Sequence, residues 1–305
     1  MPNYSIIHKQ DIFITEKYSP DIGKDGLGFL SRSFERHFNE RPYLDHTCYL
    51  FLTKTTRERS RQQSNWNTLC RKFLVPKEIQ DRETLERFME SVGQFESIVN
   101  DSGLVRLERL STEEITGTED GPGVIERYLT LSADGSVMLQ DMQLNPDEMR
   151  IGDKRLCLHT LSDLDDLPGR VRTDGRYERL STDRSDCRLS YASPVGIMLP
   201  CDHIYNQWIF IDDSGENLAR FEKTAKNMQS LSRYSRSNQI NKEWLDEYLN
   251  VAHTNGLQSV RCHCNVIAWA ESGDELRRVK NDVGSALALM ECTPRHNTTD
   301  LPVLY

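Results

Sequence analysis

The 305-residue sequence lacks any hydrophobic run long enough to cross a bilayer. Its longest unbroken apolar segments are only five residues long, as at residues 48–52, whereas a transmembrane helix needs about 20. The first ten residues, MPNYSIIHKQ, contain no apolar core of the kind found in secretory signals. We therefore expect a cytoplasmic protein without a transmembrane helix.

The sequence also lacks a surplus of positive charge. Lys and Arg number 38 against 47 Asp and Glu, and the net charge of −9 argues against broad, non-specific binding of nucleic acid. The eight cysteines occur in a long chain with no export signal, so we interpret them as free thiols in a reducing compartment. Apolar residues make up 37%, enough for a sizeable core.

Recognisable catalytic and cofactor motifs are missing as well. The P-loop pattern G-x-x-x-x-G-K-[ST] has no match, and no G-x-S-x-G nucleophile elbow occurs. Cys262 and Cys264 would share one face of a strand while His263 points to the other, which argues against a metal site. We therefore assign no catalytic, cofactor-binding or metal-binding residue.

Strand and helix patterns alternate at both ends of the chain. Alternating or short apolar segments predict strands at residues 4–14, 46–54, 105–111, 155–161, 203–211 and 258–270. Apolar residues at helical spacing predict helices at residues 25–39, 79–100 and 215–231, around 240–252, and after Ser272. The aromatic-rich run at 46–54 suits a strand that is buried on both faces.

Two local signals support these helices. The sequences Ser111–Glu114 and Ser272–Glu275 both fit the capping box S-x-x-E, which marks a helix start. The clearest helical pattern lies in residues 79–100, where apolar residues form one stripe along the predicted helix: Leu85, Phe88, Val92, Phe95 and Val99.

Together these patterns predict an α+β fold with two layered lobes of mixed sheet and flanking helices. The similar order of elements at the two ends leaves an internal pseudo-repeat open. We expect three regions: an N-terminal α/β lobe (1–131), a loop-rich connecting region with short strands (132–200) and a C-terminal α/β lobe (201–305). The polar segment 163–186 is predicted to be an exposed loop or a mobile insertion.

Three acids in that polar segment leave a free-standing enzyme open as an alternative. Asp163, Asp165 and Asp166 could perform acid–base chemistry if they lined a deep pocket with shifted pKa values. In a stretch punctuated by Pro and Gly, however, acids are more often solvated loop charges. A flat, solvated loop would argue against the enzyme.

Two segments of this acidic chain are rich in basic residues, and we call them basic strips. Residues 54–72 carry six basic side chains and one acidic side chain, and residues 217–242 carry the same numbers. Such strips favour contact with an acidic protein, a membrane surface or nucleic acid, although ordinary solvated surface gives the same pattern. Trp66 and Tyr234 lie inside the strips and would suit stacking on bases or contacts with protein.

Several long and unusual sequence segments resemble those of a known family. They are LSRSFERHFNERP (30–42), HTCYLFLTKTTRER (46–59), STDRSDCRLSYASPVG (181–196), NMQSLSRYSRSNQINKEW (227–244) and NDVGSALALMECTPRHNTTDLPVLY (281–305). Over about residues 3–305 the chain resembles the N-terminal region of the TraG-type conjugation ATPases of conjugative transposons. Those proteins are similar to the CagE/TrbE/VirB class of type IV secretion ATPases.

The resemblance implies that the catalytic machinery lies elsewhere. In this family a RecA-like motor domain carries the Walker A and Walker B motifs, and we expect it after residue 305. ATP and Mg²⁺ are expected only in that motor domain. We therefore expect no enzyme activity and no cofactor in these 305 residues, whereas the full-length parent is expected to be an ATPase.

For this part of the protein the resemblance implies docking. In related ATPases the N-terminal region associates with inner-membrane subunits of the transfer channel and with neighbouring subunits. We expect peripheral attachment on the cytoplasmic side of the inner membrane, with other transfer ATPases and further copies of the chain as additional partners. The residues that we predict to bind a partner are Arg57, Arg59, Arg61, Arg233 and Arg236. A contact with single-stranded DNA that weakens steeply with salt stays open as an alternative.

Overall fold

The structure of the chain is a computed structural model. It describes residues 4–17, 28–39, 42–55, 81–119, 121–132, 141–145, 148–161, 163, 166–169, 171, 175–176, 181–196, 198–211, 213–296 and 305. Its helices are α1 (Phe29–Asn39), α4 (Arg82–Asp101), α5 (Thr112–Thr116), α6 (Val124–Thr130), α7 (Ser193–Gly196), α8 (Ser214–Leu231), α9 (Arg236–Asn255) and α10 (Gly273–Leu289). Its strands are β1 (Tyr4–Lys17), β2 (Pro42–Thr55), β3 (Met142–Leu144), β4 (Met149–Ile151), β5 (Lys154–Leu161), β6 (Gly175–Arg176), β7 (Arg188–Leu189), β8 (His203–Ile211), β9 (Val260–Ala270) and β10 (Arg295–His296).

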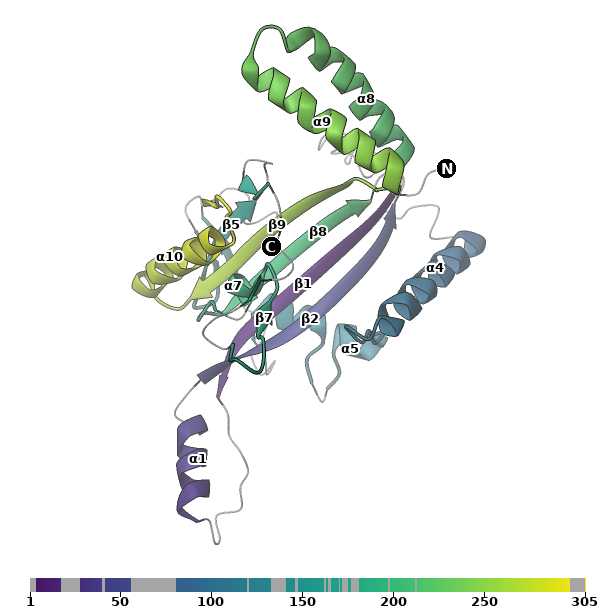
Figure 1. The fold of residues 1–305 in the computed structure, drawn as a ribbon. Helices are drawn as coiled ribbons and strands as arrows, with labels where there is room; N and C mark the ends of the chain where they lie inside the picture. The colour runs from purple at the N-terminus through teal and green to yellow at the C-terminus, as the bar shows by residue number, and fades with distance from the viewer. Residues whose placement is uncertain are drawn as a thin grey trace. The chain divides into compact units, whose positions relative to one another are not determined.

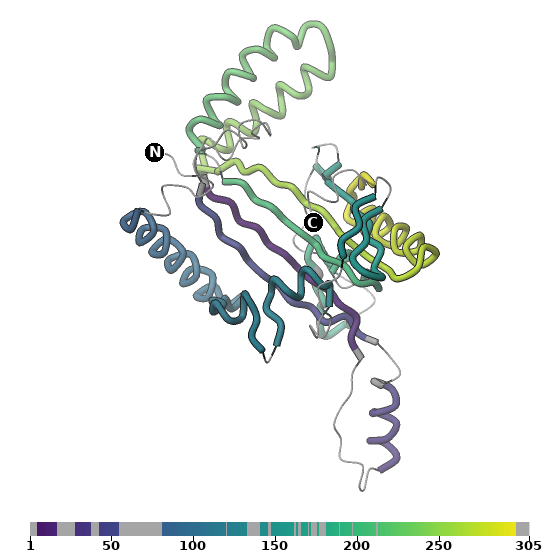
Figure 2. Tube along the Cα trace, turned by 180° about the vertical axis from the view of Figure 1, so that it is seen from behind, coloured from purple at the N-terminus to yellow at the C-terminus, as the bar shows by residue number. Residues whose placement is uncertain are grey.

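These elements confirm the α+β class. One sheet of eight strands follows the order β2-β1-β8-β9-β5-β4-β3, with β10 paired to β5, and β6 pairs with β7 in a separate ribbon. The sheet is antiparallel rather than mixed in strand direction, as Figure 1 shows for β1, β2, β8 and β9. Figure 2 shows the same strands from behind.

Two compact units make up the chain, and each is drawn from three separated stretches. Unit 1 comprises Met1–His8, Leu50–Leu107 and Trp208–Cys262. Unit 2 comprises Lys9–Tyr49, Glu108–Gln207 and His263–Tyr305. Strands β1, β2, β8 and β9 contribute residues to both units. The sequential division into residues 1–131, 132–200 and 201–305 stays a prediction.

Helix α10 covers one face of the sheet in unit 2. It begins after Ser272, whose hydroxyl accepts a hydrogen bond from the Glu275 amide (3.2 Å), as the sequence pattern predicts. The stripe expected on this helix is buried: Leu276, Val279, Val283, Leu287 and Met290. It packs with residues of β5, β9 and α7 in one hydrophobic core.

A second core lies on the opposite face of the same strands. Leu158, Ile204 and Ile267 at its centre are completely buried, and Leu131 after α6 packs against them. Neighbouring residues of β9 alternate between the two cores, so both faces of this strand are covered. That double burial explains why residues 266–270 form a continuous apolar run.

In unit 1 a helical hairpin connects β8 to β9. Helices α8 and α9 pack against each other along their length, with Ala225, Leu249 and Ala252 buried (Figure 1). Gly256, with a φ of 63°, ends α9 in the left-handed conformation that glycine adopts at little cost. Both helices were predicted by the spacing of their apolar residues.

The structure corrects two details of the sequence prediction. Residues 105–111 form no strand, and the amide of Leu107 donates to the side chain of Asn100 (2.7 Å) instead of to a ladder partner. Strand β2 is an edge strand and is not buried on both faces, since Phe51 is 40% exposed. Helix α4 is present as predicted, but none of its residues is fully buried.

Candidate docking surface

The turn between α8 and α9 carries two of the predicted partner-binding residues, Arg233 and Arg236. The 18 residues of α8 span about 27 Å, so the turn lies far from β8, the strand that precedes the helix. Both arginines are exposed. In the part of the chain that the structure describes, neither guanidinium group has an ion-pair partner.

Local hydrogen bonds fix the shape of this turn. The Tyr234 amide donates to the Leu231 carbonyl (3.0 Å), and the Asn238 side chain donates to the same carbonyl (3.3 Å). The hydroxyl of Ser235 accepts from the Ser237 amide (3.2 Å) and caps α9. The turn is therefore closed by its own backbone and small polar side chains, which leaves its large side chains available for a partner.

Large apolar side chains lie beside the arginines. Tyr234 is 84% exposed in the turn, and Leu231 and Ile240 on either side of it are also exposed. Trp244, 67% exposed, follows Ile240 by one helical turn on α9. Exposed aromatic side chains next to arginines are typical of residues that dominate binding energy at interfaces.

Charge is distributed unevenly along the hairpin. We call residues 223–242 the hairpin end; this segment contains five basic residues and no acidic one, and it is bounded by Glu222 and Glu243. Of its cations, Lys242 is neutralised by Asp246 at 2.8 Å. The hairpin end is therefore a locally positive surface on an acidic chain.

The two units also differ in net charge. Unit 1 contains 17 basic and 15 acidic residues, a net charge of +2, whereas unit 2 contains 21 and 32, a net charge of −11. The acidity of the chain therefore comes from unit 2, and the hairpin end belongs to the unit that favours anionic partners.

The other predicted partner-binding residues are not placed by the structure. Arg57, Arg59 and Arg61 lie outside the described residues, as does Asp165 of the acidic cluster. For these positions the expectations drawn from the sequence stay predictions.

The acidic cluster after β5 has a structural role in the described residues. Asp166 is only 2% exposed, which corrects the interpretation of this acid as a solvated loop charge. It accepts a hydrogen bond from Nε of Arg295 (2.9 Å), while Nη2 of the same arginine lies 2.7 Å from Asp163. The Thr293 amide also donates to the Asp166 carbonyl (2.9 Å). These contacts tie the loop after β5 to β10.

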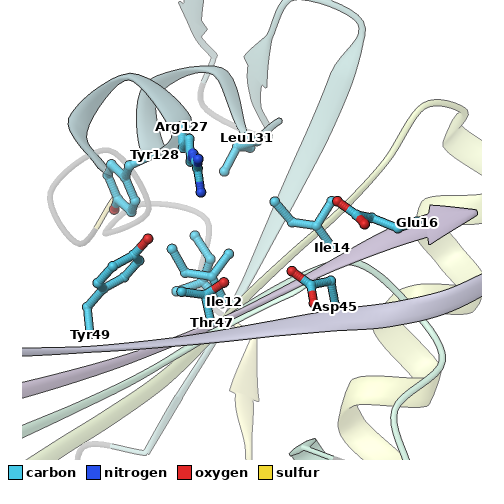
Figure 3. A pocket seen from close by; sticks show the side chains of 10 residues that line it. Ile12, Ile14, Glu16, Asp45, Thr47, Tyr49, Arg127, Tyr128 and Leu131 are labelled. Atoms are coloured by element: carbon cyan, nitrogen blue, oxygen red, sulfur yellow. The ribbon is translucent and has the colours of Figure 1, made fainter. Parts of the chain in front are cut away.

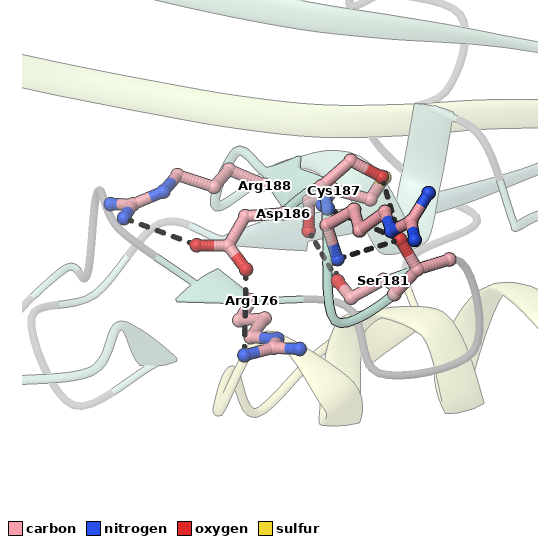
Figure 4. A network of polar contacts seen from close by, with 8 residues as sticks. Arg176, Ser181, Asp186, Cys187 and Arg188 are labelled. Carbon is pink, nitrogen blue, oxygen red and sulfur yellow. Dashed lines mark hydrogen bonds and ion pairs between the residues drawn. The ribbon is translucent and has the colours of Figure 1, made fainter.

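A second polar network lies further along the same segment (Figure 4). Asp186 pairs with Arg176 (3.4 Å) and Arg188 (3.7 Å) across the ribbon of β6 and β7. Ser181 donates to the Cys187 carbonyl (3.3 Å) and accepts from the Cys187 amide (3.1 Å). Such exposed ion pairs contribute little stability.

One cavity lies between the sheet of unit 2 and α6 (Figure 3). Its volume is about 80 Å³, and its polar lining includes Glu16, Asp45, Arg127 and Tyr49. Pockets for small molecules usually measure roughly 300–1,000 Å³. At about 30 Å³ per water molecule, this cavity has room for only a few waters and not for a nucleotide.

Aromatic rings on β1, β2 and β8 form a row that the sequence patterns did not predict. His8 stacks on Trp208 with centroids 3.6 Å apart and on Phe51 at 5.3 Å. The Arg261 guanidinium covers Phe210 at 5.3 Å. Each of these rings therefore has at least one face covered by another ring or by an arginine.

Buried amides connect three central strands in unit 2. Gln10 of β1 donates to Asn206 of β8 (3.2 Å), and Asn206 donates to Asn265 of β9 (3.0 Å). All three side chains are buried. Since unpaired amides would be costly in this environment, the row favours one register of the three strands.

Two buried histidines are held in the neutral form. Burial lowers the pKa of His203 to about 4, and burial followed by the charges of His296 and Lys280 lowers the pKa of His159 to about 4. Nδ1 of His203 donates to the Cys201 carbonyl (2.7 Å), which fixes its tautomer. Across the described ranges, no group of three or more His, Cys, Asp or Glu side chains is placed to hold a metal ion.

The cysteines that the structure describes are free thiols, as expected. Burial raises the pKa of Cys157 to about 11 and that of Cys201 to about 12. A thiol with a raised pKa is a poor nucleophile and a poor metal ligand at neutral pH. These two cysteines therefore serve packing, which agrees with their place in or against the α10 core.

Comparison with known proteins adds no family assignment. No protein-family model matches the chain, and no curated protein is significantly similar to it. None of the described helices is long and apolar enough to cross a membrane.

Proposed function

We propose that this chain is the N-terminal docking and assembly domain of a conjugative DNA-transfer ATPase, attached peripherally to the cytoplasmic side of the inner membrane. The sequence segments at residues 30–42, 227–244 and 281–305 support the choice of family. The observation that carries the docking role is the hairpin end, a positive and partly apolar surface on an acidic chain. In this proposal the motor domain binds ATP and Mg²⁺, and this domain holds the motor at the channel.

The chemistry of the hairpin end suits docking. Arg233 and Arg236 lack ion-pair partners within the described residues, so they do not have to break an ion pair before they bind a carboxylate or phosphate. Arginine presents a planar fork that recognises such groups with two parallel hydrogen bonds. A positive surface also steers an anionic partner and speeds the encounter, and this effect weakens with salt.

The alternatives receive less support. A module that contacts single-stranded DNA would use the arginines and exposed rings of the hairpin end but would leave the aliphatic Leu231 and Ile240 in water. Asp163 and Asp166 are paired with Arg295, which accounts for them without catalysis. Both alternatives stay predictions.

Capture by the inner-membrane channel subunits in detergent tests the proposal. The double variant Arg233→Glu/Arg236→Glu should reduce capture about tenfold or more at low salt, because two attractive charges become repulsive. The control variant is Arg277→Glu, an exposed position on α10 that already pairs with Asp274, and it should bind as the parent does. Equal capture of all three proteins, or capture that does not weaken with salt, would contradict the proposal.

A further inference from the structure

We propose that the hairpin end binds the surface of an anionic phospholipid bilayer directly. This inference rests on the proposed docking function and names the partner of the same surface. Its three parts are the charge of the hairpin end, the apolar side chains among those charges, and the distances along α9.

The charge of the hairpin end matches an anionic bilayer. Five cations fall within 20 consecutive residues without an intervening acid, and among the described residues four of them have no acid that neutralises them as Asp246 neutralises Lys242. Each basic residue near an anionic bilayer raises the binding constant about fivefold at physiological ionic strength. The acids of α9 begin only at Glu243, one residue beyond the hairpin end.

The apolar side chains distinguish a bilayer from a hydrated anion. Leu231, Tyr234 and Ile240 are exposed among the cations. A nucleic-acid backbone or an acidic peptide without apolar side chains would use the cations but would leave two aliphatic side chains in water. A bilayer interface takes up both kinds of group: aliphatic chains enter the acyl boundary, while tyrosine rings and snorkelling arginines stay at the headgroups.

The length of α9 sets how deep each residue would lie. Ile240 lies about 6 Å and Trp244 about 12 Å along the helix axis from Arg236. Segments that bind at an interface enter about 5–10 Å into the boundary of headgroups and acyl chains. Insertion by the turn first therefore brings Leu231 and Ile240 into the acyl boundary and the Tyr234 ring to the headgroups, and it leaves Trp244 farther out.

Vesicle co-sedimentation of the whole chain tests the inference. The chain should bind mixed phosphatidylglycerol–phosphatidylcholine vesicles and should not bind phosphatidylcholine vesicles. Arg233→Gln/Arg236→Gln should weaken binding about 25-fold, because two cations at about fivefold each are lost. Leu231→Ser/Tyr234→Ser should also weaken it, whereas the controls Arg277→Gln and Val251→Ser, which change an exposed cation and an exposed aliphatic residue elsewhere, should not.

Depth-dependent quenching gives an independent readout. In the variant Tyr234→Trp, lipids brominated in the acyl chain should quench a larger fraction of the total tryptophan fluorescence than in the parent chain, whose four tryptophans include Trp244. The same fractional quenching in both proteins, or none in either, would overturn the insertion by the turn. Circular dichroism melts of each variant establish that it is folded.

The outcomes separate this inference from the docking function. If vesicles fail to bind while detergent-solubilised channel subunits still capture the chain, the lipid inference is wrong and docking stands. If vesicles bind but the subunits never capture the chain, the proposed contact with the channel is wrong and the lipid inference stands. Binding to a single-stranded oligonucleotide or an acidic peptide in place of vesicles would overturn the lipid inference.

Discussion

Acid should destabilise this fold through its buried histidines, and His203 is the sharpest case. The imidazole is completely buried, its ring stacks on Phe13 at 4.4 Å, and its Nδ1 donates to a carbonyl. The nearby charge of Asp202 favours protonation, and that of His46 opposes it. Burial outweighs the favourable contacts and lowers the pKa from its usual 6.5 to about 4.

The sign and size of the effect follow from linkage. The unfolded chain takes up a proton on this histidine near pH 6.5, whereas the folded chain does so only near pH 4. The contribution of the neutral His203 to folding stability is therefore complete above pH 6.5 and is lost as the pH falls toward 4. For a shift of this size, His203 removes about 2 kcal/mol of stability between pH 7.5 and pH 5, and about 3 kcal/mol at pH 4.

Urea unfolding at pH 7.5 and pH 5 measures this loss. The variant His203→Gln, which keeps a hydrogen-bond donor but does not titrate, should lose about 2 kcal/mol less stability between the two pH values than the parent chain does. Leu156→Ala is the control: it removes buried apolar contacts on β5 without removing a titrating group, so it should lower stability by similar amounts at both pH values. An unchanged pH dependence in His203→Gln would refute the argument.

Two further predictions concern the packing of unit 2. Asn206→Ala leaves buried groups of Gln10 and Asn265 unpaired and should destabilise the chain by about 2–6 kcal/mol in urea unfolding. The double variant Asn206→Ala/Asn265→Ala should lose less stability than the sum of the losses in the two single variants. Strict additivity of the two losses would contradict the amide row. At Gly123 a Cβ atom would overlap backbone atoms of residues 115–117, so Gly123→Ala should lower stability by about 1–3 kcal/mol. Gly121 has open space around it, so Gly121→Ala should not lower stability. Equal melting temperatures for the two variants would be inconsistent with this packing.

Local patterns predicted the elements that depend on local geometry. The stripe of α10 and its cap at Ser272 are both formed, because helical period and capping are fixed within a few residues. Strands β5 and β9 also agree with their predicted positions. At residues 105–111 the same reasoning failed, because an alternating pattern specifies an extended chain but cannot supply a neighbouring strand.

Long-range pairings could not be predicted from the sequence. Asp166 and Arg295 are 129 residues apart, and nothing in the polar segment around Asp166 indicates that its carboxylate is buried. The amide row joins residues of three strands whose order in the sheet is a property of the whole fold. Likewise, the count of charges identified residues 217–242 as basic, but only the hairpin shows that Arg233, Tyr234 and Arg236 lie together at its end.

Photocrosslinking at the hairpin end would show whether this segment holds the proposed docking domain at the inner membrane. A benzophenone amino acid would replace Tyr234 in cells that contain the remaining transfer proteins, with Arg277 on α10 as the control position. We expect adducts with phospholipid or with inner-membrane channel subunits at position 234 and none of these at position 277. Adducts only with soluble proteins at position 234, or the same adducts at both positions, would contradict it.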